Sequence, residues 1–234
     1  MIPIRDDQPR FSVPFVNYFI IALNSVVYLF EYLIERQDPR ALNDLIYQFA
    51  VVPRLAVGAL TGVPHFNPVA AFVPIVTSMF LHGSFWHILS NMWVLWIFGD
   101  NIEDHLGHFK YLLFYLTCGI AASISHILLN LNSVVPTIGA SGAIAGVMGA
   151  YFLLYPRARV LTWFPPIFVF YLPAWVTLGY WFVVQFLSGT STMIFYSGQT
   201  GGVAFWAHVG GFVAGLILIK MMPERAQRSR YSTW

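Results

Sequence analysis

The sequence predicts an all-α polytopic membrane protein, a six-transmembrane-helix bundle with a long, partly membrane-embedded loop between helices 1 and 2. Of its 234 residues, 58% are hydrophobic and only 9% are charged, against roughly 25% charged residues in an ordinary soluble domain. No Asp, Glu, Lys or Arg occurs in four long windows, 11–30, 55–99, 111–156 and 160–219. Because a spanning helix needs about 20 apolar residues, these windows have room for six spans.

The first half of the chain contains two of these spans. The first is expected over 14–34, with a proline at its start, where the missing N–H costs little. Glycines and prolines punctuate 58–83, so we expect a loop over 35–83 rather than long helices. Irregular backbone at membrane depth must be covered by protein or line a wet cavity. The second span is expected over 84–98.

The remaining four spans fill the last two windows. Polar residues at 130–136 divide spans three and four, and the polar stretch 188–202 divides spans five and six. We therefore expect a cytoplasmic N-terminal tail at 1–13, a six-helix membrane domain at 14–221 and a cytoplasmic C-terminal tail at 222–234.

The positive charges predict the orientation. One end of the spans receives Arg5, Arg10, Lys110, Arg157, Arg159, Lys220, Arg225, Arg228 and Arg230, whereas the other receives Arg36, Arg40 and Arg54. Membrane proteins keep such an excess on the cytoplasmic side, which places both termini there. No transit signature is visible and the tails are short, so a bacterial inner membrane is the expected location.

Several classes of function are excluded by the same composition. The net charge of +2 is small and the basic residues lie at membrane edges, which excludes a nucleic-acid partner. The single cysteine, Cys118, forms no intramolecular disulfide. A metal site at His82, His87 and His208 is a weak alternative, because no carboxylate or cysteine completes the shell and no zinc spacing occurs. No cofactor or metal is predicted.

Four polar side chains share one depth in this arrangement. Spans two, four and six all begin at the outer face, and each residue of a helix advances about 1.5 Å. Ser141, His208, His87 and Asn91 then lie roughly 6–12 Å below that face. The topology alone therefore brings them into one layer of the membrane.

Ser141 and His208 form a candidate catalytic pair. A serine in a membrane helix often only bonds a carbonyl one turn back, and a lone histidine often only bonds a neighbouring helix. Glycines flank Ser141 at the start of a helix, where free N–H groups can bind a developing oxyanion. Small residues at helical spacing beside His208 allow a close helix neighbour. A hydroxyl beside a histidine suits nucleophilic acyl transfer, and the absence of acidic residues nearby in the sequence makes the pair a dyad.

His87 and Asn91 are four residues apart and therefore share one helix face. Two donors on one face can hold a single anionic oxygen.

Taken together, these motifs resemble the rhomboid intramembrane serine proteases of the bacterial six-span type, over about residues 75–215. The Gly-x-Ser-Gly motif is matched by Gly139, Ser141 and Gly142, and the His-x-x-x-Asn motif by His87 and Asn91. The motif Ala-His-x-x-Gly-x-x-x-Gly is matched by Ala207, His208, Gly211 and Gly215. Glu103 and Gly107 match a structural turn of the family.

The resemblance implies a serine endopeptidase that cleaves membrane-anchored proteins within the lipid bilayer. It makes Ser141 the nucleophile and His208 the general base. It assigns the oxyanion hole to His87, Asn91 and the Ser141 N–H, and gives supporting roles to Gly139, Gly142, Gly211 and Gly215.

The sequence departs from the family pattern in two places. Val73 and Pro74 stand where many relatives have Trp-Arg, and Ala145 stands where an aromatic residue often packs on the histidine. The orientation of the imidazole must then come from other groups. Two alternatives have other functions: a non-proteolytic rhomboid-like protein that binds client transmembrane helices, whose members typically lack the serine or histidine, and a transporter, which would favour internal repeats that we do not find.

Overall fold

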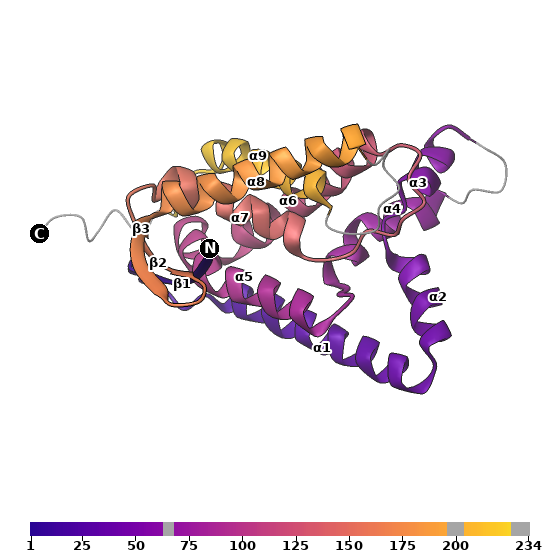
Figure 1. Ribbon diagram of the computed structural model, residues 1–234, viewed down its shortest axis with the longest axis horizontal. Helices are drawn as coiled ribbons and strands as arrows, with labels where there is room; N and C mark the ends of the chain where they lie inside the picture. Colours follow the sequence, from indigo (N-terminus) through magenta and orange to yellow (C-terminus); the bar gives the residue numbers. More distant parts are fainter. Residues whose placement is uncertain (63–67, 196–203, 226–234) are drawn as a thin grey trace, which may run out of the picture.

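The computed structural model describes residues 1–62, 68–195 and 204–225 (Figure 1). Within these residues the chain forms nine α-helices, one short 3-10 helix and a three-stranded sheet. The α-helices are α1 (Phe15–Gln37), α2 (Pro39–Phe49), α3 (Pro53–Leu60), α4 (Pro68–Thr77), α5 (Phe85–Leu106), α6 (His108–Leu129), α7 (Ser141–Leu154), α8 (Ala174–Phe195) and α9 (Phe205–Met221).

Two of the helices, α1 and α6, are each long and apolar enough to cross a membrane. Helix α4 and the 3-10 helix η1 (Ser78–Phe80) form one segment, which meets α5 at a bend of 86°. If this bent pair counts as one span, it is a third candidate. Helices α7 and α9 are apolar but shorter. The described part of the chain is therefore mostly helical, with two or three candidate membrane spans.

Helix α7 forms the centre of the bundle. It packs against α6 and α9, and α5 contacts another of its sides. Small residues line the crossing with α9: a methyl group on Gly211 would overlap the main-chain oxygen of Gly142, and one on Gly215 would overlap that of Gly146. Bare helix faces let two backbones approach closely, so this crossing positions whatever side chains stand beside it.

A buried carboxylate joins α1 to α5. Glu103 is fully buried, and it accepts hydrogen bonds from the main-chain N–H groups of Val16 at 2.9 Å and Asn17 at 2.6 Å. Its side chain also meets His108 Nδ1. The first N–H groups of a helix have no partner within the helix, and Glu103 supplies one at the start of α1. The structural role expected for Glu103 is confirmed.

The stretch expected as a loop over 35–83 contains short helices instead. Helices α2, α3 and α4 each begin at a proline, Pro39, Pro53 and Pro68 respectively. In the first turn of a helix the N–H is unpaired in any case, and proline already has a helical φ. Pro68, which was expected to interrupt helical structure, therefore begins a helix, as Pro39 and Pro53 do.

The span expected to begin near residue 160 is preceded by a hairpin. Strands β2 (Arg159–Phe164) and β3 (Phe168–Pro173) pair antiparallel, and β1 (Ile2–Asp6) pairs with β2 to give the order β1-β2-β3. A short apolar run of aromatic and β-branched residues suits a strand as well as a buried helix. The sheet lies at one end of the helical bundle, opposite α2 and α3 (Figure 1).

Candidate functional site

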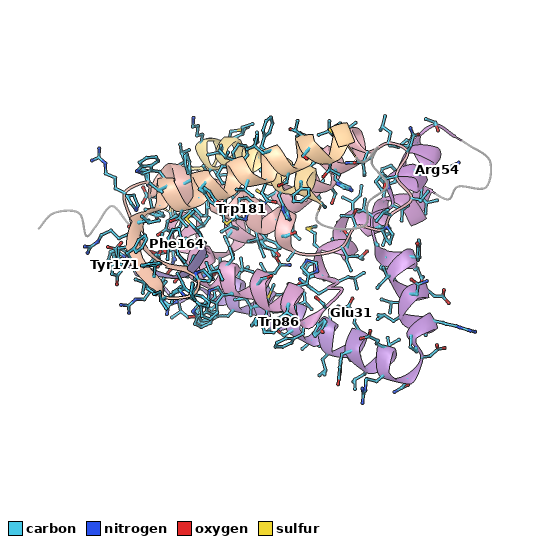
Figure 2. All side chains as sticks on the ribbon, viewed as in Figure 1. Glu31, Arg54, Trp86, Phe164, Tyr171 and Trp181 are labelled. Atoms are coloured by element: carbon cyan, nitrogen blue, oxygen red, sulfur yellow. The ribbon has the colours of Figure 1, made fainter. Side chains whose placement is uncertain are left out.

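A cavity of about 980 Å³ lies between α5 and α8 and reaches α7 and α9. Its lining includes Ser141, His208, His87 and Asn91. The four side chains that the sequence places at one depth therefore open into one cavity. Figure 2 labels Trp86 on α5 and Trp181 on α8, which are among the aromatic residues of its wall.

Ser141 is the first residue of α7, and the backbone before it is tightly held. Gly139 has φ of +121°, a conformation that glycine adopts without steric cost. Its N–H donates to the Ser78 carbonyl at 2.8 Å, while Thr137 pairs with Val51. This support orients the start of α7, where the Ser141 N–H has no acceptor within the helix.

His208 lies in hydrogen-bond contact with Ser141, as the sequence predicts. Its Nε2 is 2.7 Å from the Ser141 Oγ, and its side chain is buried, with 9% of the residue exposed. Ser141 comes from α7 and His208 from α9, so the glycine-lined crossing of these helices brings the pair together. The catalytic roles of both residues stay predictions.

Sequence reasoning missed Gln185. Its Oε1 lies 2.7 Å from His208 Nδ1, on the ring nitrogen that does not face Ser141. Trp181, one turn earlier on α8, lies against the imidazole with ring centroids 5.6 Å apart. Position 145 carries an alanine in place of the aromatic residue that often packs on the histidine. Gln185 and Trp181 are the groups that contact the imidazole instead. Gln185 is the only Asn or Gln within 174–195. A polar side chain inside a membrane helix is a candidate functional residue, and this rule, which singled out His208, could have found Gln185 as well.

His87 and Asn91 lie beside the backbone that precedes Ser141. A Cβ built on Gly139 would be 2.7 Å from His87 Nε2 and 3.7 Å from Asn91 Nδ2. The Asn91 Nδ2 is buried and has no hydrogen-bond partner among the described residues. A buried amide donor without a partner is costly, and here it lies next to a candidate nucleophile.

His82 lies on the same side of the site as His87. Neither of its ring nitrogens meets hydrogen-bond geometry with another group among the described residues. Its main-chain N–H donates to the buried Glu31 carboxylate on α1, and its ring meets that of His87 edge to face, with centroids 5.0 Å apart. His82 therefore packs behind His87.

The assembled groups can support acyl transfer. A serine hydroxyl contacts an imidazole nitrogen, the other nitrogen is held by an amide, and potential N–H donors lie nearby. Nucleophile, base and orienting group are the parts that nucleophilic catalysis by serine requires.

Comparison with known proteins finds a matching family model and several relatives of similar sequence. A model of the Rhomboid domain matches residues 70–225. The chain is 33% identical over 167 residues to Rhomboid protein 1, mitochondrial, of Saccharomyces cerevisiae, which covers 69% of this chain and 45% of the yeast protein. It is 33% identical over 139 residues to the human Presenilin-associated rhomboid-like protein, mitochondrial, covering 56% of this chain and 35% of the human protein.

A plant relative, Rhomboid-like protein 11, chloroplastic, of Arabidopsis thaliana, is 32% identical over 157 residues, 66% of this chain and 54% of the plant protein. The chain thus spans about half or less of the length of these relatives. Their names place these relatives in mitochondria or in chloroplasts. They contradict the expected bacterial inner membrane, which rested only on the lack of a visible transit signature and on short tails.

The matched segment contains all four residues that the sequence singles out. It runs from α4 past the end of α9 and includes Ser141, His208, His87 and Asn91. From this match over most of its length, the chain belongs to the rhomboid family.

Proposed function

We propose that the chain is an intramembrane serine endopeptidase that hydrolyses peptide bonds in or near transmembrane segments of membrane-anchored proteins. The observation that carries the proposal is the 2.7 Å contact between Ser141 Oγ and His208 Nε2, at the wall of a cavity lined by α5, α7, α8 and α9. Membership of the rhomboid family supports it.

The reaction divides into acylation and deacylation. Ser141 Oγ attacks the scissile carbonyl carbon while His208 Nε2 takes the hydroxyl proton. The C–N bond then breaks, and His208 returns the proton to the leaving amine. A water molecule attacks the acyl-enzyme with His208 again as base, which releases the new carboxyl end and restores Ser141.

The oxyanion of each tetrahedral intermediate would be held by the Ser141 N–H, His87 and Asn91. Such donors act best when they are already oriented and shielded from water. The unpartnered Asn91 amide and the short separation between His87 and Gly139 support this assignment.

Six spans are proposed within the membrane domain 14–221: α1, α5, α6, α7, α8 and α9. Helix α7 has 14 residues and is therefore about 21 Å long, less than the roughly 30 Å hydrocarbon core. Its first residue, Ser141, then lies below the membrane surface. The names of the relatives support an organellar membrane as the location.

Labelling with a serine-reactive fluorophosphonate tests the proposal. The purified chain should be labelled, and Ser141→Ala and His208→Ala should both abolish labelling and cleavage of a membrane-anchored substrate. Ser25→Ala is the matched control, because within the part of the chain that the structure describes the Ser25 hydroxyl on α1 bonds just the Ile21 carbonyl. Labelling that persists in Ser141→Ala would contradict the mechanism. No labelling of folded wild-type protein in detergent or lipid would favour the non-proteolytic alternative that binds client helices.

A further inference from the structure

We propose that Gln185 is a positioning residue, whose side-chain carbonyl fixes the tautomer of His208 that can accept the Ser141 proton. The proposal rests on the proposed function, and it extends the dyad to a Ser-His-Gln chain of hydrogen bonds.

The two ring nitrogens of His208 have different partners. Nε2 lies 2.7 Å from Ser141 Oγ, and Nδ1 lies 2.7 Å from Gln185 Oε1. The three residues come from three helices, α7, α9 and α8. Gln185 is as buried as His208, each with 9% of its surface exposed. The imidazole is therefore held at both nitrogens within one buried chain.

This arrangement selects one protonation state of the ring. A neutral imidazole has one N–H donor and one acceptor nitrogen. The Gln185 carbonyl oxygen can only accept, so Nδ1 carries the hydrogen and Nε2 is left as the acceptor. In the opposite tautomer, Nε2 would carry the hydrogen and could not take the proton from Ser141.

A neutral amide suits this position better than a carboxylate. An unpaired carboxylate inside a membrane bundle is expensive, and no charged residue occurs within 160–219. Glutamine supplies the acceptor without a buried charge. The proton removed from Ser141 then creates an imidazolium whose Nδ1–H is already bonded to an oxygen.

The packing of α8 on α9 holds Gln185 in place. A Cβ on Gly189, one turn after Gln185, would lie 3.1 Å from a ring carbon of Trp206, so the missing side chain lets the two helices approach. One turn before Gln185, Trp181 covers the imidazole. The glutamine side chain thus reaches Nδ1 from a helix face fixed on both sides.

Two substitutions at Gln185 separate positioning from packing. Gln185→Leu keeps the approximate size and removes the acceptor, whereas Gln185→Glu keeps an acceptor oxygen. Thr190→Val on the same helix is the matched control, because among the described residues the Thr190 hydroxyl bonds the Phe186 carbonyl alone. Each variant is assayed for kcat and KM on a membrane-anchored substrate, for the rate of fluorophosphonate labelling and for thermal stability.

For Gln185→Leu we expect kcat and labelling rate to fall by about 10- to 100-fold, as for the loss of one buried hydrogen bond, with KM unchanged. Gln185→Glu should recover most of the rate, and Thr190→Val should match wild type. The 15N spectrum of His208 should show a hydrogen on Nδ1 in wild type and a mixture of tautomers in Gln185→Leu.

Wild-type rate and an unchanged 15N spectrum in Gln185→Leu would overturn the positioning role. So would a folded Gln185→Glu that stays as slow as Gln185→Leu at a pH at which its carboxyl is ionised, because an acceptor would then not suffice. If wild type itself shows no Ser141-dependent hydrolysis, the proposed function fails. The 15N spectra still report in that case whether Gln185 sets the His208 tautomer.

Discussion

Gly211 of α9 lies against the main-chain oxygen of Gly142 on α7, with no room for a side chain between them. Gly142 directly follows Ser141, and Gly211 comes three residues after His208. The distance between the two backbones at this point therefore sets the distance between the hydroxyl and the imidazole. The close crossing of α7 and α9 at these two glycines thus determines the geometry of the candidate site.

Gly211→Ala should separate α9 from α7. The added methyl group would overlap the Gly142 carbonyl, and overpacking of this kind costs about 1–3 kcal/mol. We expect a lower melting temperature and at least about a tenfold loss of kcat, since near-attack geometry is lost with small displacements. Gly179→Ala is the control: its Cβ would meet only Phe152, at 3.5 Å. Wild-type turnover by Gly211→Ala would contradict the proposed coupling.

Asn91→Ala should impair catalysis without lowering stability. Its Nδ2 has no hydrogen-bond partner among the described residues, so the substitution breaks no hydrogen bond of that donor to them. Removal of one oxyanion donor typically costs about 10²–10³ in kcat. Single-turnover cleavage and thermal denaturation of the same sample measure both effects. Equal losses of stability and rate would instead identify Asn91 as a structural residue.

Glu103→Ala should destabilise the contact between α1 and α5. The substitution leaves the N–H groups of Val16 and Asn17 without their acceptor, and a hydrogen bond to a charged group is worth about 1.5–3 kcal/mol. Denaturation in detergent should show a loss of that order or more. Glu103→Gln retains one acceptor oxygen and should lose less, and an equal loss in both variants would argue against the capping role.

Asp6 should make the stability of the sheet depend on pH. Burial raises the pKa of the Asp6 carboxyl from 3.8 to about 6, although its hydrogen bond with the Tyr151 hydroxyl opposes the shift. Between these values the folded chain binds more protons than the unfolded chain. The contribution of Asp6 to stability therefore decreases as pH rises from about 4 to 6.

Asp6→Asn isolates this effect. The difference in melting temperature between the variant and wild type should shift in favour of the variant from pH 4 to pH 7. Asp7 has the opposite sign, because its hydrogen bond with Arg159 lowers the pKa of its carboxyl, and its contribution is lost as pH falls. A difference that stays constant across the range would exclude a raised Asp6 pKa.

The sequence identified the parts of the site that carry chemistry in unusual surroundings. Ser141 and His208 stood out because a histidine inside a membrane helix is a candidate functional residue and because glycines beside both residues allow close helix packing, and the structure brings the two into contact. Gln185 could have been noticed as the only Asn or Gln within 174–195. Its contact with His208 depends on how α8 packs against α9, which the sequence alone does not give.

The fold was less predictable where apolar runs are short. Residues 159–173 read as the start of a span, but length and composition alone do not separate a buried strand from a helix. Pro68 was expected to interrupt helical structure, yet it begins α4, because a proline is well tolerated in the first turn of a helix. Within the described residues, two or three helical segments are long and apolar enough to cross a membrane, so the six expected spans stay a prediction.

During synthesis, β1 leaves the ribosome long before its partner strand. The Asp7 carboxylate accepts the Arg159 main-chain N–H across 152 residues of chain, and β1 pairs with β2 over the same interval. Contacts between residues so far apart in the sequence form late, because closing the loop between them costs conformational entropy. Helices α1, α5, α6 and α7 lie between β1 and β2 in the chain. All four are therefore synthesised before β1 can pair with β2 and the sheet can close.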